Sequence, residues 1–183
     1  MRIARLAARV VIGGLFVGHG TQKLLGWFGG AGMSGTEGMM RGLGLHPPRQ
    51  HAYAAGVTET AGGALLALGL ATPLAASALT GTMITAIRKV HWRNGVWNRG
   101  GGYEYNAVLI ASVLALAESG PGNVSLDHLL GWERTGSRWA LAALAGGALA
   151  SSAAVEYGHR HATAEVIDAR EPVEQQAGAE RQA

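Results

Sequence analysis

The chain has 183 residues, of which 48% are hydrophobic and only 15% are charged, and its formal net charge is +3. It contains no cysteine, which excludes disulfides, thiol catalysis, cysteine-ligated zinc and iron–sulfur clusters built by this chain alone. Its basic residues stand at the ends of long apolar runs rather than among aromatic residues along one face, so no nucleic-acid partner is expected. This segregation of charge predicts an integral membrane protein whose main partner is the lipid bilayer.

The first apolar run covers residues 3–28 and carries basic residues only near its start and its end. It is long for the apolar part of a secretory signal peptide, and no clear Ala-X-Ala cleavage site follows it. We therefore expect a retained first transmembrane helix. Within it, Gly14 and Gly18 share one helix face, which is typical of a close helix–helix contact.

The next two runs, residues 52–70 and 73–87, are separated only by Ala71 and Thr72. Because proline is tolerated at the start of a helix, Pro73 fits the first turn of the third helix. The sequence thus predicts a helical hairpin with almost no loop. Gly62-Gly63 could serve close packing in its first arm.

The fourth run, residues 106–117, is short for a full membrane span. It spans only if the residues just before it lie at the interface and the bilayer adapts to the mismatch. The fifth run, residues 139–155, is rich in small residues, including Gly146-Gly147, and only marginally apolar. We expect it to span, with a helix lying along the surface as the alternative.

These runs predict an all-α protein, a polytopic membrane helical bundle with a four-helix core and a fifth C-terminal helix. The core is assigned to residues 1–130 and the additional membrane or interfacial helix to residues 131–156. Residues 157–183 are charged and glutamine-rich without periodicity, so we expect a disordered tail.

Ionisable groups inside a membrane span are costly and are functional candidates by default. His19 and Lys23 are four residues apart and share one face of the first helix. Glu59 lies eight residues after His51, about 12 Å along the second helix. These three residues, His19, Lys23 and Glu59, are the predicted catalytic candidates.

A second group of polar residues lies at the ends of the following helices. His91 closes the third helix, and Glu104 and Asn106 open the fourth; these three are candidates for cofactor binding. Because successive helices alternate in direction, all six candidates fall toward one membrane face. The sequence therefore predicts a cavity that opens toward that face.

Each candidate also has a purely structural interpretation. Lys23 can extend its ammonium group to the headgroups, Glu59 can form an ion pair, and His19 can form hydrogen bonds across helices. His91 can be an ordinary interfacial residue. The aromatic residues near this face suit an aromatic belt better than quinone stacking: Trp27, Phe28, Trp92 and Trp97. No metal site is expected, since no pair of ligands follows a known metal-binding spacing.

A set of residues spread over the first 130 positions occurs in a characteristic order. They are Gly18-His19-Gly20 with Lys23, Glu59 with Gly62-Gly63, Gly69-Leu70 with Thr72, His91, Glu104-Tyr105-Asn106, Gly120-Pro121-Gly122 and Ser125-Leu126-Asp127. Together they resemble the DoxX family of small bacterial membrane proteins. In the last group, Ser125 is expected to cap a short helix, with Asp127 near the positive start of that helix.

The resemblance implies four core transmembrane helices and a multi-pass protein of the bacterial inner membrane. Some related proteins are linked to a membrane thiosulfate:quinone oxidoreductase. Our first hypothesis is a subunit that supports quinone- or sulfur-linked redox chemistry with other membrane or redox subunits. In it, Glu59 and His19 relay protons and Lys23 sets the local field or holds an anionic group.

Two other functions stay open, as does the question of whether the chain is an enzyme. The second hypothesis is a non-enzymatic scaffold or accessory subunit whose buried polar cluster specifies helix packing. The third is a small-solute transporter, which is less favoured because no internal repeat is visible.

Overall fold

The computed structural model describes residues 2–180, with side chains described for residues 3–163. Within these residues the protein is helical and has no strand, which confirms the predicted all-α class. The helices are α1 (Arg2–Leu25), α2 (Gly32–Gly42), α3 (Pro48–Leu68), α4 (Thr72–Ala86), α5 (Glu104–Ser119), α6 (Leu126–Leu129) and α7 (Ser137–Glu180). A π-helical turn, Ile87–His91, extends α4 at its C-terminal end.

The apolar runs of the sequence correspond to α1, α3, α4, α5 and the first part of α7. Helix α1 ends at Leu25, three residues before the predicted end, because Gly26 has a φ of 73° and leaves the helical region. Helix α3 begins at Pro48 rather than near residue 52, and Pro48 occupies the first turn, where its missing N–H has no cost.

Helix α2 is the element that the sequence analysis did not predict. It contains four of the chain's many glycines and has no continuous apolar run, so its intrinsic tendency to form a helix is weak. Its tertiary contacts compensate for this weakness. Met40 packs against Leu45 and Ala52 in a small cluster of its own, and α2 lies against both α1 and α3.

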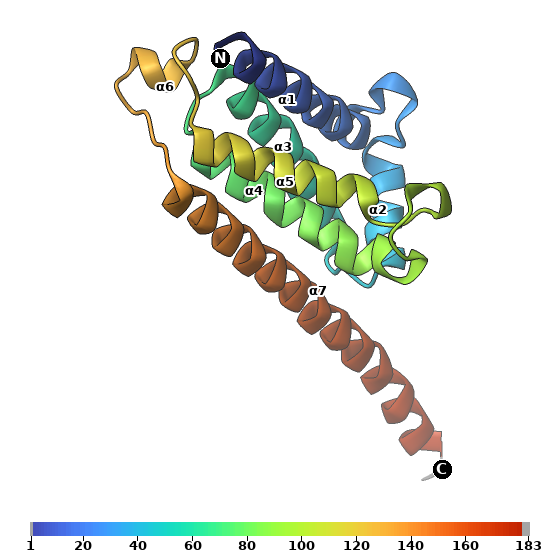
Figure 1. Cartoon of the computed structure of the whole chain (residues 1–183). Helices are drawn as coiled ribbons and strands as arrows, with labels where there is room; N and C mark the ends of the chain where they lie inside the picture. Colours follow the sequence, from blue (N-terminus) through green and yellow to red (C-terminus); the bar gives the residue numbers. More distant parts are fainter. Residues whose placement is uncertain (1, 181–183) are drawn as a thin grey trace.

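The bundle is built from helix pairs that run alongside one another (Figure 1). Helix α1 packs mainly on α3, whereas α4 contacts α3, α5 and α7. Their shared core includes Phe16, Leu66, Ala75, Ala76, Leu79, Met83, Leu109, Val113, Leu116, Ala117 and Ala143. Helix α4 is therefore the central element, and α7 joins the bundle by packing along it.

Glycines allow α1 and α3 to approach closely, but they are not the predicted pair. A Cβ atom on Gly14 or Gly18 would meet nothing within 4 Å, so neither glycine lies at a close helix–helix contact within the described chain. The contact lies on the other side of α1. A Cβ atom on Gly13 would lie 2.5 Å from the carbonyl oxygen of Gly63, and one on Gly20 would lie 2.7 Å from that of Gly56.

Gly62-Gly63 serves close packing, as predicted, and so does the pair Gly146-Gly147. Gly63 faces α1, and Gly62 faces the side chain of Leu79 in α4. On α7, a Cβ atom on Gly147 would lie 2.8 Å from the carbonyl oxygen of Ser77 and 2.9 Å from the backbone nitrogen of Gly81. Small residues therefore bring α4 against both of its long neighbours.

Helix α7 is much longer than the predicted fifth run. It continues to Glu180, through a segment for which the sequence predicts no regular structure, and Figure 1 shows it running past the end of the bundle. The segment is rich in alanine, glutamate, glutamine and arginine, which favour helices intrinsically. The last three residues of the predicted tail lie outside the described residues.

Two arginines of α1 close the end of the bundle where the chain begins. Arg5 donates a hydrogen bond to the carbonyl oxygen of Ser119 at 2.8 Å. Arg9 is only 1% exposed and donates to the carbonyl oxygens of Pro121 and Val124. These bonds tie the loop after α5 to α1 and supply acceptors for the two terminal nitrogens of the buried guanidinium.

The short helix α6 follows the same loop. Ser125 Oγ accepts a hydrogen bond from the backbone N–H of His128 at 3.2 Å, which confirms the predicted cap. Asp127 lies in the first turn of α6, as predicted. Its buried carboxylate also has a role that was not predicted: it accepts hydrogen bonds from the backbone N–H groups of Ala71 and Thr72 and so caps α4.

Two helical segments in the described part of the chain are long and apolar enough to cross a membrane. They are Ile3–Leu25 in α1 and Ser137–Thr163 in α7. Only 22% of the most apolar window of each is buried inside the protein. The core helix of a soluble protein would be mostly buried, so both segments present apolar surface to their surroundings.

Candidate functional site

A cavity of about 620 Å³ lies between the helices at the end of the bundle opposite α6. Helices α1, α2, α3, α4, α5 and α7 all contribute to its walls. Most of the exposed wall is apolar in area. The polar side chains that line it are His19, Lys23, His51, Thr58, Glu59, Thr82, Thr85, Lys89, His91, Asn98, Tyr105, Asn106 and Ser151. Its size and its lining are those of a site for an organic ligand.

An ion pair between α1 and α3 forms one wall of the cavity. Lys23 Nζ donates a hydrogen bond to Glu59 Oε2. The Glu59 side chain is 3% exposed and that of Lys23 is 24% exposed, so the carboxylate is the deeper member of the pair. Glycine contacts hold α1 close to α3 one turn away, at Gly20 and Gly56, and this close approach fixes the distance between the two side chains.

His19 lies beside this pair on the same face of α1. Its Nδ1 atom is 3.1 Å from Gln22 Oε1, one turn further along α1. Its ring meets that of Tyr105 edge to face, with 6.4 Å between the ring centres. The imidazole is therefore held between α1 and α5, and both rings line the cavity.

Asn106 is the polar group that α5 contributes to the buried part of the cavity. The residue is 6% exposed, and its Nδ2 atom donates a hydrogen bond to Met83 Sδ at 3.3 Å. A thioether sulfur is a weak acceptor. A ligand oxygen would therefore be a better partner for this amide than the one it has.

The two remaining candidates lie near the mouth and have structural roles there. His91 lines the cavity, but its Nδ1 atom is 2.7 Å from the carbonyl oxygen of Gly101, a contact that fastens the loop before α5. Glu104 is not part of the wall and accepts a hydrogen bond from the backbone N–H of Asn98 at 3.0 Å. The structure thus brings together five of the six predicted residues.

Two parts of the wall were not identified from the sequence. Helix α2 supplies Met39 and Met40, and α7 supplies Ala150, Ser151 and Ala154. The methionines could have been suspected, because their flexible thioether side chains suit binding surfaces that must adapt. Nothing in the sequence places small residues of α7 at this site.

His51 also lines the cavity, although the sequence analysis used it only to measure depth. Its Nε2 atom is buried and has no hydrogen-bond partner, and its ring packs near that of Tyr157 at 5.9 Å. Among the described side chains, no three histidine, aspartate or glutamate residues are grouped closely enough to hold a metal ion.

The family model described as DoxX matches residues 4–92, which cover α1 from Ala4 onward together with α2, α3 and α4 with its π-helical turn. Neither the curated proteins nor the solved structures contain a significant match. The matched segment carries four of the cavity's predicted residues: His19, Lys23, Glu59 and His91.

Proposed function

We propose, from the membership of residues 4–92 in the DoxX family, that this membrane protein is a multi-pass subunit that binds a quinone in its cavity. In this proposal it lies in the bacterial inner membrane and supports redox chemistry carried out with a partner subunit. The observation that carries the proposal is the largely apolar cavity of about 620 Å³, with Lys23, Glu59, His19 and Asn106 in its wall.

The outer surface of the bundle supports a multi-pass arrangement. Each long helix exposes at least one large aliphatic side chain. They include Val10, Val11 and Leu15 of α1, Val57 of α3, Leu74 of α4, Val108 of α5 and Leu141 and Leu149 of α7. Such a surface is unfavourable in water and suits lipid. Helix α5, with 16 residues, is about 24 Å long, so the bilayer would thin slightly around it.

The chemistry of the cavity fits a quinone. A quinone has an apolar ring and two carbonyl oxygens that accept hydrogen bonds, and the wall offers a wide apolar surface with a few donors. The Lys23 ammonium and the His19 ring come from α1, and the Asn106 amide comes from α5. In this proposal the two oxygens of the ring accept hydrogen bonds from these donors.

The residues then have distinct roles. Reduction of a quinone to a quinol adds two electrons and two protons, one proton at each oxygen. A partner redox subunit supplies the electrons, and His19 and Glu59 pass protons from the open end of the cavity to the oxygens. Lys23 holds the developing negative charge through its ammonium group.

The closed end of the bundle argues against a transport pathway. The buried charges there, Arg9 and Asp127, bind backbone groups of the loop after α5 and of the α4 start. None of the residues that line the cavity comes from this end. A solute would therefore find polar groups in only one half of the bundle.

The test is binding of decyl-ubiquinone to the full chain purified in mild detergent, measured by native mass spectrometry. We expect one bound quinone in the wild type. Glu59→Gln should weaken binding about tenfold or more, because Glu59 holds the Lys23 ammonium at the cavity wall and a hydrogen bond to a charged group contributes roughly 1.5–3 kcal/mol. Glu104→Gln is the matched control, because that carboxylate lies at the same end but outside the cavity wall.

If the wild type binds no quinone although it is folded, the redox proposal is wrong. In that case the Lys23–Glu59 pair would be a packing element, as the scaffold hypothesis holds.

A further inference from the structure

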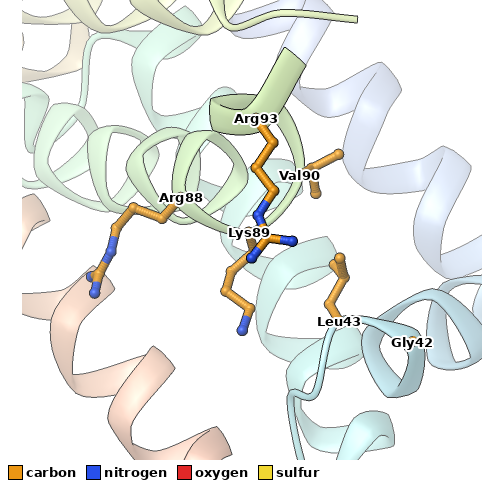
Figure 2. A pocket seen from close by; sticks show the side chains of 6 residues that line it. All are labelled: Gly42, Leu43, Arg88, Lys89, Val90 and Arg93. Atoms are coloured by element: carbon orange, nitrogen blue, oxygen red, sulfur yellow. The ribbon is translucent and has the colours of Figure 1, made fainter. Parts of the chain in front are cut away.

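A second, smaller pocket adjoins the mouth of the cavity (Figure 2). It has a volume of about 260 Å³ and is lined by Gly42, Leu43, Arg88, Lys89, Val90 and Arg93. Leu43, Lys89 and Val90 line both spaces. In Figure 2, Lys89 and Arg93 extend between the end of α4 and Leu43, and Arg88 extends toward α7. We call this space the basic pocket.

The charge of the basic pocket is not neutralised by carboxylates. Its lining has three cations and no acidic residue. Arg88 donates to the hydroxyl groups of Ser151 and Ser152 at 3.4 and 3.3 Å, and Lys89 Nζ lies 3.1 Å from His159 Nε2. None of these partners is an anion, and for Arg93 no side-chain hydrogen bond or ion pair is found among the described residues. Three like charges in one pocket repel each other, and a bound anion would relieve this repulsion.

The geometry of the end of α4 produces this concentration of charge. Arg88 and Lys89 belong to the π-helical turn Ile87–His91, and Arg93 to the next turn. A π-helical turn is rare and is frequently found at functional sites. Burial and the neighbouring Arg88 lower the pKa of Lys89, so an anion at this place would also stabilise its ammonium form.

The surroundings of the basic pocket identify the level of the lipid headgroups. Trp92, which follows the π-helical turn directly, is 65% exposed, and Trp97, five residues further along the chain, is 72% exposed. Exposed tryptophans are characteristic of the membrane–water interface. Leu43 and Val90 form an apolar boundary on the side that leads to the cavity. The basic pocket thus lies at the level of the lipid phosphate groups and has an apolar boundary on one side.

We propose that Arg88, Lys89 and Arg93 bind the phosphate group of an anionic membrane phospholipid. Arginine and lysine are the usual partners of phosphate, and basic pockets between transmembrane helices bind anionic headgroups in this way. The glycerol and the first part of the acyl chains then lie against Leu43, Val90 and the exposed tryptophans. A phospholipid bound here stands at the entrance of the cavity. This site is independent of whether the cavity binds a quinone.

The rival explanation is that these cations only determine on which side of the membrane the loop lies. A topological role of this kind requires positive charge in the loop but no binding pocket. Arg99 could fulfil the topological role equally well, because it is an exposed cation in the same loop and lies outside the basic pocket. Arg99 therefore provides the matched control.

The test uses the full chain in detergent, with phosphatidylglycerol and phosphatidylcholine added in equal amounts and bound lipid counted by native mass spectrometry. The wild type should retain phosphatidylglycerol selectively. Arg93→Gln, which breaks no bond within the described chain, should weaken this binding about fivefold, since a cation near anionic headgroups contributes about 1 kcal/mol. Arg88→Gln combined with Arg93→Gln should weaken it further, and Arg99→Gln should have no effect.

Three results would overturn the proposal. One is equal retention of the two lipids by the wild type, and another is an equal loss in the Arg93 and Arg99 variants. The third is release of the phosphatidylglycerol by millimolar inorganic phosphate, which would identify a site for a soluble anion instead of a lipid. Gel filtration of each variant checks that it is folded.

Discussion

Asp127 Oδ1 accepts a hydrogen bond from the backbone N–H of Ala71 at 2.8 Å, although the two residues are 56 positions apart. Ala71 has a φ of 49°, in the left-handed region, which costs a residue with a Cβ atom about 1–2 kcal/mol. The other oxygen of Asp127 accepts from the N–H and the hydroxyl of Thr72, both at 3.1 Å. One buried carboxylate thus stabilises both the tight turn and the first free N–H groups of α4.

Replacing Asp127 tests this relationship. We expect Asp127→Ala to lower the free energy of unfolding by about 2–3 kcal/mol, because it leaves buried N–H groups without an acceptor. Asp127→Asn keeps one carbonyl oxygen and should cost less. Denaturation in mixed detergent micelles, followed by circular dichroism, gives both values. Glu133→Gln, an exposed carboxylate in the segment after α6, should stay within about 0.5 kcal/mol of the wild type.

Arg9 holds the same end of the bundle from the α1 side. Arg9→Met keeps a long apolar stem but removes the donors to Pro121 and Val124, so we expect a loss of about 2 kcal/mol. Besides lowering the stability of the whole protein, Arg9→Met should loosen the loop after α5 locally. Hydrogen exchange of residues 120–125 should accelerate in Arg9→Met but not in Arg99→Gln, and unchanged exchange in Arg9→Met would show that the loop is held by other contacts.

The α1–α3 contact can be tested with two glycine-to-alanine variants of α1, one inside the contact and one outside it. A Cβ atom on Gly20 would lie 2.6 Å from the backbone nitrogen of Thr60, which cannot move aside. Gly20→Ala should therefore destabilise the protein by about 1–3 kcal/mol. Gly18→Ala meets nothing within 4 Å and should be neutral, or stabilising by up to about 1 kcal/mol because alanine favours helices. Equal effects of the two variants would refute the assigned contact.

These glycines also show how far the sequence determined the fold. Runs of apolar residues located α1, α3, α4, α5 and the beginning of α7, because long uncharged stretches carry a strong signal. The face of α1 that contacts α3 could not be predicted. From the sequence alone, Gly13, Gly14, Gly18 and Gly20 are equally suitable for a close helix–helix contact. Only the opposing atoms of α3 distinguish them.

The candidate site was predictable to a similar degree. Alternating helix direction was sufficient to bring His19, Lys23, Glu59 and Asn106 to one end, since depth along each helix follows from position in the sequence. The depth of a residue along its helix does not reveal which other helices lie beside it. The walls formed by α2 and α7 were missed for this reason, as was the capping of α4 by Asp127, which depends on the path of a loop.

The Lys23–Glu59 pair allows the structural and the functional hypotheses to be separated by a double-mutant cycle. Lys23→Met leaves the deeply buried carboxylate without its partner and should cost about 3 kcal/mol or more. Glu59→Gln should cost less, because Lys23 is 24% exposed and its ammonium can still reach water. The double variant Lys23→Met, Glu59→Met should recover most of the stability, since an apolar pair of similar volume often replaces a buried ion pair at little cost. If the double variant is stable but no longer binds decyl-ubiquinone, the pair serves the ligand; if it is stable and binds normally, the pair serves packing alone.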